Sequence, residues 1–511
     1  MIKLQINNKN IEVKEGTRLI EAARLNGINI PSLCYRNDLP HYTSCSVCLV
    51  KNKTTDKFIH SCSAQALEGM VIDASGKEVL ELRREAISML LSEHRAECEA
   101  PCKLVCPLGL NIPLMNRHIQ KGDIKAAAEL AMAEMGMPET FCKICPAYCE
   151  NACRRKMIDH TISIVNIKRY SSESHNLKEP LSGNLKKSTG KKVAIIGGGF
   201  SGITASFFLS QEGHHCVIFE KTDHAGGAII NTLEEETKYI FEHELKNVLA
   251  LGVEMKYGIE VNNDILSRSL TKEYDSVVIS VPGFDNLKNA TISENHIQFK
   301  GDSMVLNDVH VFKIGKAAKQ NKQIIRDIGQ AKKASMAINN FLKSSRLISV
   351  VKQFNSVIGK IEDHEKKVWL KETPEETNRF KTPISLEESI EEAKNCLHCD
   401  CRALNNCMLR NISGDYNVIN PKVSMYSHPI EKKINFTSGL IFENAKCIKC
   451  GLCVRLLNKE TINAGLGFQG RGFKSIISEP LTHDFNDILN NKTDILVEVC
   501  PTGALSKHED F

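Results

Sequence analysis

The sequence predicts a multidomain protein of mixed α+β and α/β class. Residues 1–15 alternate between apolar and polar side chains, which indicates a β-hairpin. Residues 77–92 repeat their apolar side chains with a helical period. Residues 193–196 form a short apolar strand that runs into a glycine-rich turn and a second helix, as in parallel α/β units. The length of 511 residues fits three to five domains.

The clustered cysteines are the feature of the sequence that indicates function most strongly. The chain has 20 cysteines, and all except Cys216 fall into five groups: Cys34, Cys45, Cys48 and Cys62; Cys98, Cys102 and Cys106; Cys142, Cys145, Cys149 and Cys153; Cys396, Cys399, Cys401 and Cys407; and Cys447, Cys450, Cys453 and Cys500. Thiolates at short spacings can converge on one metal centre. Several such groups in a long chain therefore indicate an electron-carrying iron–sulfur protein.

Two alternatives explain abundant cysteine less well. A disulfide scaffold is typical of small secreted domains that lack a core, whereas this long chain is 42% hydrophobic. Four-cysteine sites also bind zinc, which would explain one group better than it explains five.

Charge and hydropathy exclude two classes of function. The net charge is only +5, and there is no dense basic tract with interleaved aromatic residues, so we expect no nucleic-acid partner. No apolar run approaches the length of a membrane span. Residues 1–4 do not begin a signal peptide. We therefore expect a cytoplasmic protein with reduced thiols.

Residues 1–76 are expected to form the first domain. After the hairpin, Thr17 is a candidate N-cap for a short helix that Gly27 ends. A cysteine loop follows. Hairpin, helix and loop in this order resemble a β-grasp ferredoxin, with the cysteine spacing of the [2Fe-2S] domain in complex I and in multimeric iron hydrogenases. The resemblance implies one [2Fe-2S] cluster held by Cys34, Cys45, Cys48 and Cys62.

Residues 77–190 are expected to form a helical domain with two [4Fe-4S] clusters. The cysteines from Cys98 to Cys153 resemble the N-terminal domain of the glutamate synthase small subunit and of dihydropyrimidine dehydrogenase. This chain departs from that family at Arg95, where an additional cysteine is usual, and at Lys168, near the position of a glutamine ligand. Seven cysteines therefore remain for eight ligand positions.

His94 is the candidate for the eighth ligand, because His94 and Cys98 resemble the His-x3-Cys start of a cluster motif in complex I. A second-shell or surface role is the alternative. The expected ligand sets are His94, Cys98, Cys102 and Cys153 for one cluster, and Cys106, Cys142, Cys145 and Cys149 for the other.

Residues 191–345 are expected to form a Rossmann-type domain. Gly197, Gly199 and Gly202 make a G-x-G-x-x-G turn between strand and helix, and Glu220 ends the second strand. With Gly226 and Gly227 this segment resembles the FAD-binding half of the glutamate synthase small subunit. The resemblance implies FAD, with the ribose on Glu220. Cys216 lies inside the second strand and is expected in the core.

The rest of that family's nucleotide machinery is missing or altered. No second glycine fingerprint for NADPH follows, and only about 118 residues separate Gly197 from the end of the closing strand at 311–314. The family's closing Gly-Asp is Gly315-Lys316 here, and its Ala-Thr-Gly is replaced by residues 281–283, Val-Pro-Gly. The alternative is a vestigial Rossmann domain that binds nothing.

Two segments complete the chain. Residues 346–410 are expected to be a linker that ends in a helix, begun by a capping box at Ser385–Glu388, and a four-cysteine motif. We rank [4Fe-4S] above zinc for that motif. Residues 411–511 resemble a bacterial two-cluster ferredoxin that has lost one cluster, because Leu457 stands where its fourth ligand would be. The remaining [4Fe-4S] ligands are Cys447, Cys450, Cys453 and Cys500.

These resemblances imply an electron-transfer subunit with one [2Fe-2S] cluster, four [4Fe-4S] clusters and FAD. The partners they imply are an NADH-oxidising flavoprotein subunit, its small thioredoxin-like [2Fe-2S] companion, and a hydrogenase, a formate dehydrogenase or ferredoxin at the other end. Two alternatives remain. One is a self-contained NAD(P)H oxidoreductase, and the other is a zinc-bound structural scaffold.

Overall fold

The computed structural model describes residues 1–174, 185–284, 304–306, 309–318, 321–344, 354–359, 361–374, 378–382, 385–419, 430–459, 465–486 and 492–508. The chain divides into two compact units. The first unit comprises residues 1–100, 351–372 and 399–511, and the second comprises residues 101–350 and 373–398. Parts of the expected linker, at 346–353, 360, 375–377 and 383–384, lie outside the described residues.

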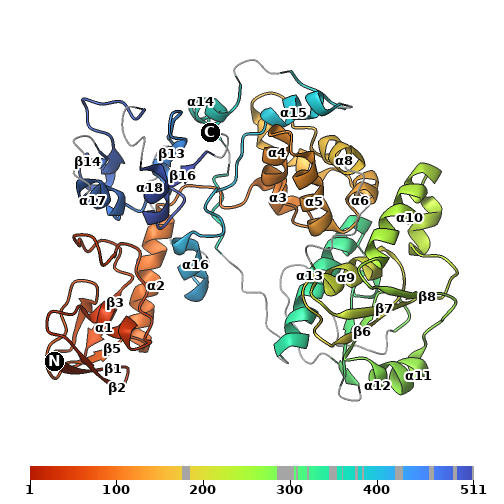
Figure 1. Cartoon of the computed structure of the whole chain (residues 1–511), viewed down its shortest axis with the longest axis horizontal. Coiled ribbons are helices and arrows are strands. Elements are labelled where there is room, and N and C mark those ends of the chain that lie inside the picture. The colour runs from red at the N-terminus through yellow and green to blue at the C-terminus, as the bar shows by residue number, and fades with distance from the viewer. Residues whose placement is uncertain are drawn as a thin grey trace. The chain divides into compact units, whose positions relative to one another are not determined.

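The N-terminal sheet of the first unit has five strands in the order β2-β1-β5-β3-β4; Figure 1 draws it in red, near the label N. The hairpin is confirmed, and its turn is formed by Asn7 and Asn8, which both adopt positive φ angles, 50° and 64°. Helix α1 begins at Leu19 with Arg18 as N-cap, so the prediction of Thr17 as the cap was wrong. The strands are β1 (Ile2–Ile6), β2 (Lys9–Val13), β3 (Leu49–Asn52), β4 (Lys57–His60) and β5 (Val71–Asp73), and α1 spans Leu19–Leu25.

Helix α2 spans Lys77–Ser92, as its periodicity predicts. Its buried Arg83 donates a hydrogen bond to the Leu49 carbonyl at the N-terminal sheet and another to the hydroxyl of Tyr416. Tyr416 follows helix α16 (Met408–Asp415). The helix thus joins the N-terminal sheet to the C-terminal part of the same unit.

The C-terminal part of the first unit contains an antiparallel sheet, β12-β13-β16, and a separate hairpin, β14-β15. Helix α17 carries one cysteine run, and α18 leads into Cys500. The elements are β12 (Lys432–Asn435), β13 (Leu440–Glu443), α17 (Leu452–Lys459), β14 (Gly467–Gln469), β15 (Ile476–Ser478), α18 (Thr493–Val499) and β16 (Leu505–Lys507). Helix α14 (Asp363–Trp369) belongs to the middle segment of this unit, residues 351–372.

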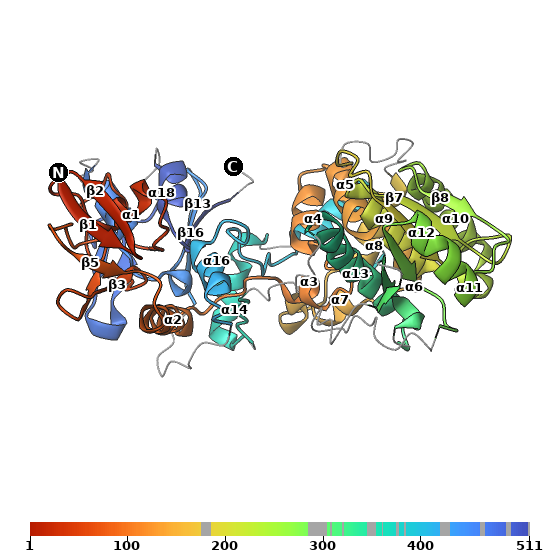
Figure 2. The same ribbon diagram turned by 90° about the horizontal axis from the view of Figure 1, so that it is seen from below.

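The second unit contains a helical part, labelled in Figure 2. Helix α4 packs against α5 and α15, and α3 packs against α7. Asn111 and Asp123 cap α4 and α5 through their side chains. Ser385 Oγ accepts a hydrogen bond from the Glu388 amide at the start of α15, as predicted. The helices are α3 (Pro101–Val105), α4 (Ile112–Gln120), α5 (Ile124–Met135), α6 (Pro138–Ile144), α7 (Tyr148–Asn151), α8 (Ile164–Ser174) and α15 (Leu386–Lys394).

A six-stranded sheet completes the second unit, in the order β10-β11-β9-β6-β7-β8. All neighbours are parallel except β10 and β11, which confirms the Rossmann-type prediction. Helix α9 packs against the long helix α13, and both figures of the chain show the two side by side. The elements are β6 (Lys192–Ile196), α9 (Phe200–Gln211), β7 (His215–Phe219), α10 (Glu235–Leu249), β8 (Glu254–Lys256), α11 (Asn263–Ile265), α12 (Thr271–Glu273), β9 (Ser276–Ile279), β10 (Met304–Leu306), β11 (Val309–Lys313) and α13 (Ile324–Ser344).

Candidate cluster sites and nucleotide pocket

The four N-terminal cysteines come together beside the β-grasp sheet. All four are buried, and the sulfur atoms of Cys48 and Cys62 are 3.0 Å apart. Hydrogen bonds from Cys45 and Cys62 hold the pKa of the Cys34 thiol far below its usual range. The ring of His41 places Nε2 3.0 Å from the Cys62 sulfur. Each predicted [2Fe-2S] ligand is therefore next to another.

The four C-terminal cysteines line one small apolar cavity, whose lining includes Cys447, Cys450, Cys453 and Cys500. Burial raises the pKa of the Cys447 thiol to about 12. A buried thiolate needs a compensating positive charge, which iron supplies when it binds. Leu457, at the position of the lost ligand, is 1% exposed, and an added Cβ on Gly465 would lie 3.2 Å from its Cβ. Apolar packing thus occupies that position.

A buried arginine joins these two cysteine groups within the first unit. Arg455, on α17, is 2% exposed. Its guanidinium donates to the carbonyl of Cys34 at 2.8 Å and to the carbonyl of Cys450 at 3.1 Å. It also donates to the carbonyl of Pro40 at 2.6 Å and to that of Gly451 at 3.2 Å. One side chain therefore connects the loops that hold two predicted clusters.

In the second unit, a buried lysine lies among one predicted ligand set. Burial alone would lower the pKa of Lys168, but the neighbouring thiols raise it above its usual value; these thiols are Cys142, Cys149, Cys106 and Cys145. Burial raises the pKa of Cys142 to about 11 and that of Cys149 to about 12, and Lys168 opposes both shifts. The four thiols predicted to share a cluster thus surround one ammonium group.

Arg155 connects the two segments of the second unit that contain Cys153 and Cys396. Its guanidinium donates to the carbonyl of Asn395, at 3.0 Å. Arg155 follows Cys153 by two residues, and Asn395 directly precedes Cys396. Cys102 lies on α3, which packs against α7, just before Cys153. The sequence had placed Cys396 in a separate group from Cys153.

Cys98 and His94 lie in the first unit. The amide of Cys401 donates to the Cys98 carbonyl at 3.1 Å, so Cys98 lies beside Cys401, within the first unit. Burial lowers the pKa of His94 to about 4, and its imidazole is therefore neutral near pH 7. Within the described part of the chain its Nδ1 atom is buried without a hydrogen-bond partner. A neutral ring nitrogen is the form that binds metals.

The glycine turn of the Rossmann sheet is built for close backbone approach. Gly197 has a φ of 103°, and a Cβ there would lie 2.4 Å from Val281. A Cβ on Gly202 would lie 2.0 Å from the carbonyl oxygen of Gly197. A Cβ on Gly199 would meet nothing closer than 3.8 Å, the Cα of Gly227. The first and third glycines thus serve the turn and helix packing, and the second leaves space for a ligand.

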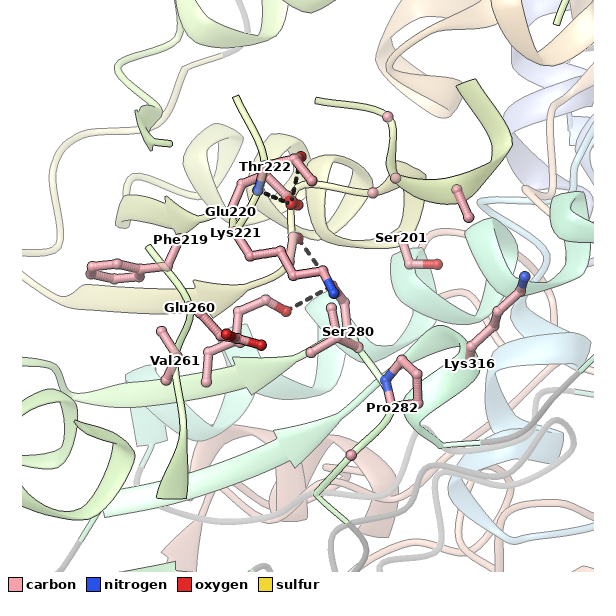
Figure 3. Close-up of a pocket in the computed structure, with 18 of the residues that line it drawn as sticks. Ser201, Phe219, Glu220, Lys221, Thr222, Glu260, Val261, Ser280, Pro282 and Lys316 are labelled. Atoms are coloured by element: carbon pink, nitrogen blue, oxygen red, sulfur yellow. Dashed lines mark hydrogen bonds between the residues drawn. The ribbon is translucent and has the colours of Figure 1, made fainter. Parts of the chain in front are cut away.

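The second glycine pair and Glu220 close the same turn. The amide of Gly226 donates to the Gly198 carbonyl at 2.8 Å. Glu220 accepts hydrogen bonds from the amide of Gly198, at 2.7 Å, and from the amide and hydroxyl of Thr222, both at 2.9 Å. Figure 3 shows Glu220 beside Thr222 in this pocket. The carboxylate lies where the acidic residue of a dinucleotide site binds the ribose.

A pocket of about 810 Å³ lies over this turn. Its lining includes all six predicted nucleotide-binding residues except Gly202, and it extends to Pro282, Gly283 and Lys316 (Figure 3). Gly315, with a φ of 54°, packs against Ser201, so the altered closing turn still lies at the helix start. The cradle fits a dinucleotide phosphate, with an ammonium group at its far side where the family has a carboxylate.

The described residues contain neither a membrane-spanning helix nor a closely convergent single-ion site. No described helix is long and apolar enough to cross a membrane. No group of three or more His, Cys, Asp or Glu side chains among the same residues converges closely enough for a single metal ion. Each iron takes one protein ligand in a [4Fe-4S] cluster and two in a [2Fe-2S] cluster, so this second result concerns single ions.

Sequence reasoning did not assign roles to Arg455, Lys446 or Lys168. Arg455 and Lys446 flank the run from Cys447 to Cys453, and basic residues inside a cysteine run are the signal that could have found them. Lys446 is buried and pairs with Glu443. Cys216 is 0% exposed in the core of the sheet, as predicted.

Three family models match parts of the chain. Residues 1–76 match a 2Fe-2S iron-sulfur cluster binding domain. Residues 76–179 match dihydropyrimidine dehydrogenase domain II, 4Fe-4S cluster. Residues 195–252 match an NAD(P)-binding Rossmann-like domain. The chain therefore contains ferredoxin-type iron–sulfur domains and a Rossmann-like domain.

Curated relatives are oxidoreductases. The chain is 27% identical over 209 residues to the NADPH-Fe(3+) oxidoreductase subunit beta of Geobacter sulfurreducens (strain DL-1 / KN400), covering 40% of this chain and 31% of that protein. It is 33% identical over 178 residues to the glutamate synthase [NADPH] small chain of Bacillus subtilis (strain 168), covering 34% of this chain and 36% of the relative. The small chain of Escherichia coli (strain K12) is 28% identical over 227 residues, covering 43% and 48%.

The chain thus spans less than half the length of each of these relatives. Among solved structures, an NAD+-reducing [NiFe]-hydrogenase is 25% identical over 18% of this chain and 39% of its own, at a TM-score of 0.17. That score is too low to support any argument about fold. The domains and the curated relatives together indicate an oxidoreductase role.

Proposed function

We propose that this chain is the electron-transfer subunit of a multisubunit NAD(P)H-linked oxidoreductase. It carries one [2Fe-2S] cluster, four [4Fe-4S] clusters and FAD, and it relays electrons between a partner NADH-oxidising flavoprotein and another redox site. A small thioredoxin-like [2Fe-2S] subunit accompanies that partner. A hydrogenase, a formate dehydrogenase or ferredoxin is the redox site at the other end.

The bridge formed by Arg455 supports this proposal most directly. It connects the main chain at Cys34, in the first cluster loop, with the main chain at Cys450, in the last. These cysteines are 416 residues apart in sequence (450 − 34), yet their loops share one buried guanidinium. Electron tunnelling weakens steeply with distance, so adjoining cluster loops favour transfer between the two centres.

FAD is proposed for the pocket over the glycine turn. Gly197, Gly199 and Gly202, with Gly226 and Gly227, would admit the pyrophosphate to the start of α9, and Glu220 would bind the ribose. When bound, the flavin supplies one- and two-electron redox chemistry. This chain's own residues bind and orient it, and Lys316 places a positive charge at one side of the pocket.

The competing candidate is a self-contained NAD(P)H oxidoreductase. The match of residues 195–252 to an NAD(P)-binding model favours it. Hydride transfer requires the nicotinamide to lie against a flavin. Only the G-x-G-x-x-G match at 197–202 joins a strand to a helix among the described residues, because the second match, at 465–470, runs through strand β14. We therefore rank the electron-transfer subunit first.

The experiment is to reconstitute electron transfer with NADH-oxidising flavoprotein partners. NADH should reduce the clusters of the full chain only when these subunits are added. Cys48→Ser, which removes one [2Fe-2S] ligand, should block that reduction, whereas Cys216→Ser, in a core cysteine outside the clusters, should not. Equal reduction of the clusters in Cys48→Ser would exclude entry at the N-terminal cluster.

A further inference from the structure

Three cysteines from two distant parts of the sequence gather inside the first unit. Cys98, Cys401 and Cys407 are each less than 10% exposed. The amide of Cys401 donates to the Cys98 carbonyl at 3.1 Å, and the amide of Cys407 donates to the Ala403 carbonyl at 2.9 Å, which closes the turn between the two thiols. Burial, together with the neighbouring thiols of Cys401 and Cys98, raises the pKa of Cys407 to about 11. The sequence had divided these thiols between two clusters.

His94 joins the same neighbourhood through Ser356. The amide of Ser356 donates to the Cys98 sulfur at 3.4 Å, and its hydroxyl donates to the His94 carbonyl at 3.1 Å. The His94 ring is buried beside Lys446, and its Nδ1 atom is buried without a hydrogen-bond partner among the described residues. Buried polar groups are normally hydrogen-bonded, so an unpartnered ring nitrogen is available to bind a metal.

We propose that His94, Cys98, Cys401 and Cys407 hold one [4Fe-4S] cluster. This regrouping rests on the proposed function, because the proposed function supplies the premise that the cysteines hold iron–sulfur clusters. The ligand count still closes. The 20 cysteines without Cys216, together with His94, give 20 ligands, which is five sets of four.

The proposed cluster adjoins the segment that follows Cys500. Helix α16, which Cys407 precedes, donates the amide of Leu409 to the Pro501 carbonyl at 3.3 Å. The Cys407 sulfur lies 4.0 Å from the same carbonyl oxygen. A Cβ on Gly503 would lie 2.3 Å from the Cys401 sulfur, so the main chain approaches this thiol as closely as glycine permits. Residues 501–503 would thus lie between the proposed cluster and the cluster that Cys500 helps to hold.

With the Arg455 bridge, this arrangement gives the first unit a chain of three centres. The order is the N-terminal [2Fe-2S] cluster, the cluster of Cys447–Cys500, and the cluster proposed here. At each step one cluster is oxidised by one electron and the next is reduced by that electron, and no covalent bond changes. The electrons come from the flavoprotein partner of the proposed function.

Lys446 supplies charge that suits such a centre. It is buried. Burial would lower the pKa of its ammonium group, but Cys401 and Glu443 raise it above the usual value. A cation beside a cluster stabilises the more negative, reduced state. The ammonium group therefore favours electron arrival at this centre, and its ion pair with Glu443 offsets part of that effect.

The test is whether Cys98 and Cys407 act as ligands of one cluster or of two. Cys98→Ala, Cys407→Ala and the double variant would be purified anaerobically as full chains, and iron and sulfide per chain measured. We expect each single variant to lose about four irons, and the double variant to lose the same four. A loss of about eight irons in the double variant, or no loss in Cys98→Ala, would overturn the regrouping.

A second pair of variants applies if ligand loss reduces folding. Gly503→Ala should alter the electron paramagnetic resonance signal of the proposed cluster by pressing on Cys401. The matched control is Gly467→Ala, because a Cβ there meets nothing within 4 Å. Identical spectra for both variants would contradict the close approach to a cluster ligand.

His94 has its own readout. His94→Cys replaces a neutral ligand with an anionic thiolate, so one cluster should be retained at a lower reduction potential. That shift should disappear in the Cys407→Ala background, since the affected cluster is then lost. A shift that persists would assign His94 to a different cluster. Each of these outcomes is independent of NADH-linked activity, so failure of the regrouping can be separated from failure of the proposed function.

Discussion

The guanidinium of Arg455 donates a hydrogen bond to the main-chain carbonyl of Cys34, 2.8 Å away, although the two residues belong to different cysteine groups. The same side chain also reaches the carbonyls of Cys450, Gly451 and Pro40. Arginine suits this role because its planar fork carries five N–H donors, whereas lysine has a single point charge. Arg455 therefore fixes two cysteine-bearing loops against each other.

Arg455→Lys should preserve both clusters and loosen the contact between their loops. At least two carbonyls would lose a charge-assisted donor, so we expect a loss of about 2–4 kcal/mol in unfolding free energy. Electron transfer between the two clusters should slow. Thermal unfolding and rapid-freeze spectroscopy measure the two effects. Arg36→Lys is the control, because Arg36 pairs with the nearby Asp38 at the surface. An equal loss of stability and of electron-transfer rate in Arg36→Lys would show that Arg455 has no special role.

Metal content is predicted at about eighteen irons per chain, from one [2Fe-2S] and four [4Fe-4S] clusters. Anaerobic iron, sulfide and zinc analysis of the full chain checks this number. Stoichiometric zinc together with fewer than about fourteen irons would show that one four-cysteine group is a zinc site.

Substitutions at two glycines of the turn should separate loss of flavin binding from loss of stability. Gly199→Val should release the flavin and leave stability and iron content nearly unchanged, since the protein itself has space at that position. Gly202→Ala should instead destabilise the domain, because its Cβ would lie 2.0 Å from the Gly197 carbonyl oxygen. Flavin absorbance and thermal unfolding distinguish the two. Intact clusters in a wild-type chain that never binds flavin would show that the altered end, with Lys316, has abolished the site.

Glu244 should make the second unit lose stability as pH rises. Burial raises its pKa to about 7, although it accepts hydrogen bonds from the amides of Glu139 and Thr140 at the start of α6, both at 2.9 Å. Between its ordinary value of 4.5 and 7, the folded state binds more protons than the unfolded state. Stability is therefore greatest below that window and falls as pH rises through it, by on the order of 2–3 kcal/mol.

Glu244→Gln should flatten this pH dependence between pH 5 and pH 8. Glu236→Gln is the matched control on the same helix, because Glu236 is 68% exposed and pairs with Lys143 at the surface. The measurement is thermal stability of the full chain at several pH values. An unchanged slope in Glu244→Gln would assign the pH dependence to other groups.

Local patterns predicted most of the fold, since they depend on periodicity and turn chemistry. Helix α2 has the bounds that its apolar spacing gives, and β6, α9 and β7 follow from the glycine turn and its flanking strands. Thr17 was mistaken for a cap, because a residue that favours N-caps lies one position before the helix boundary that the structure adopts.

The candidate sites were harder to predict than the fold, because sequence spacing groups only cysteines that are near one another in the chain. Cys447, Cys450 and Cys453 could be joined to Cys500 through a known cluster pattern. The neighbourhood of Cys98 and Cys401 could not, since a tertiary contact across about 300 residues brings them together. The position of Arg455 beside the Cys447–Cys453 run is visible in the sequence, but its partners are not, because they are main-chain carbonyls, two of them in the distant loop of Cys34 and Pro40.

The central claim is that this chain transfers electrons and does not itself oxidise nicotinamide nucleotides. The most direct measurement is anaerobic dye reduction by NADH and by NADPH with the purified full chain, after its clusters and flavin have been confirmed. The account predicts no turnover above background with either nucleotide alone, and activity once NADH-oxidising flavoprotein subunits are added. Turnover of NADH or NADPH by the isolated chain at ordinary enzymatic rates, about 1 to 1,000 per second, would contradict it and establish a self-contained reductase.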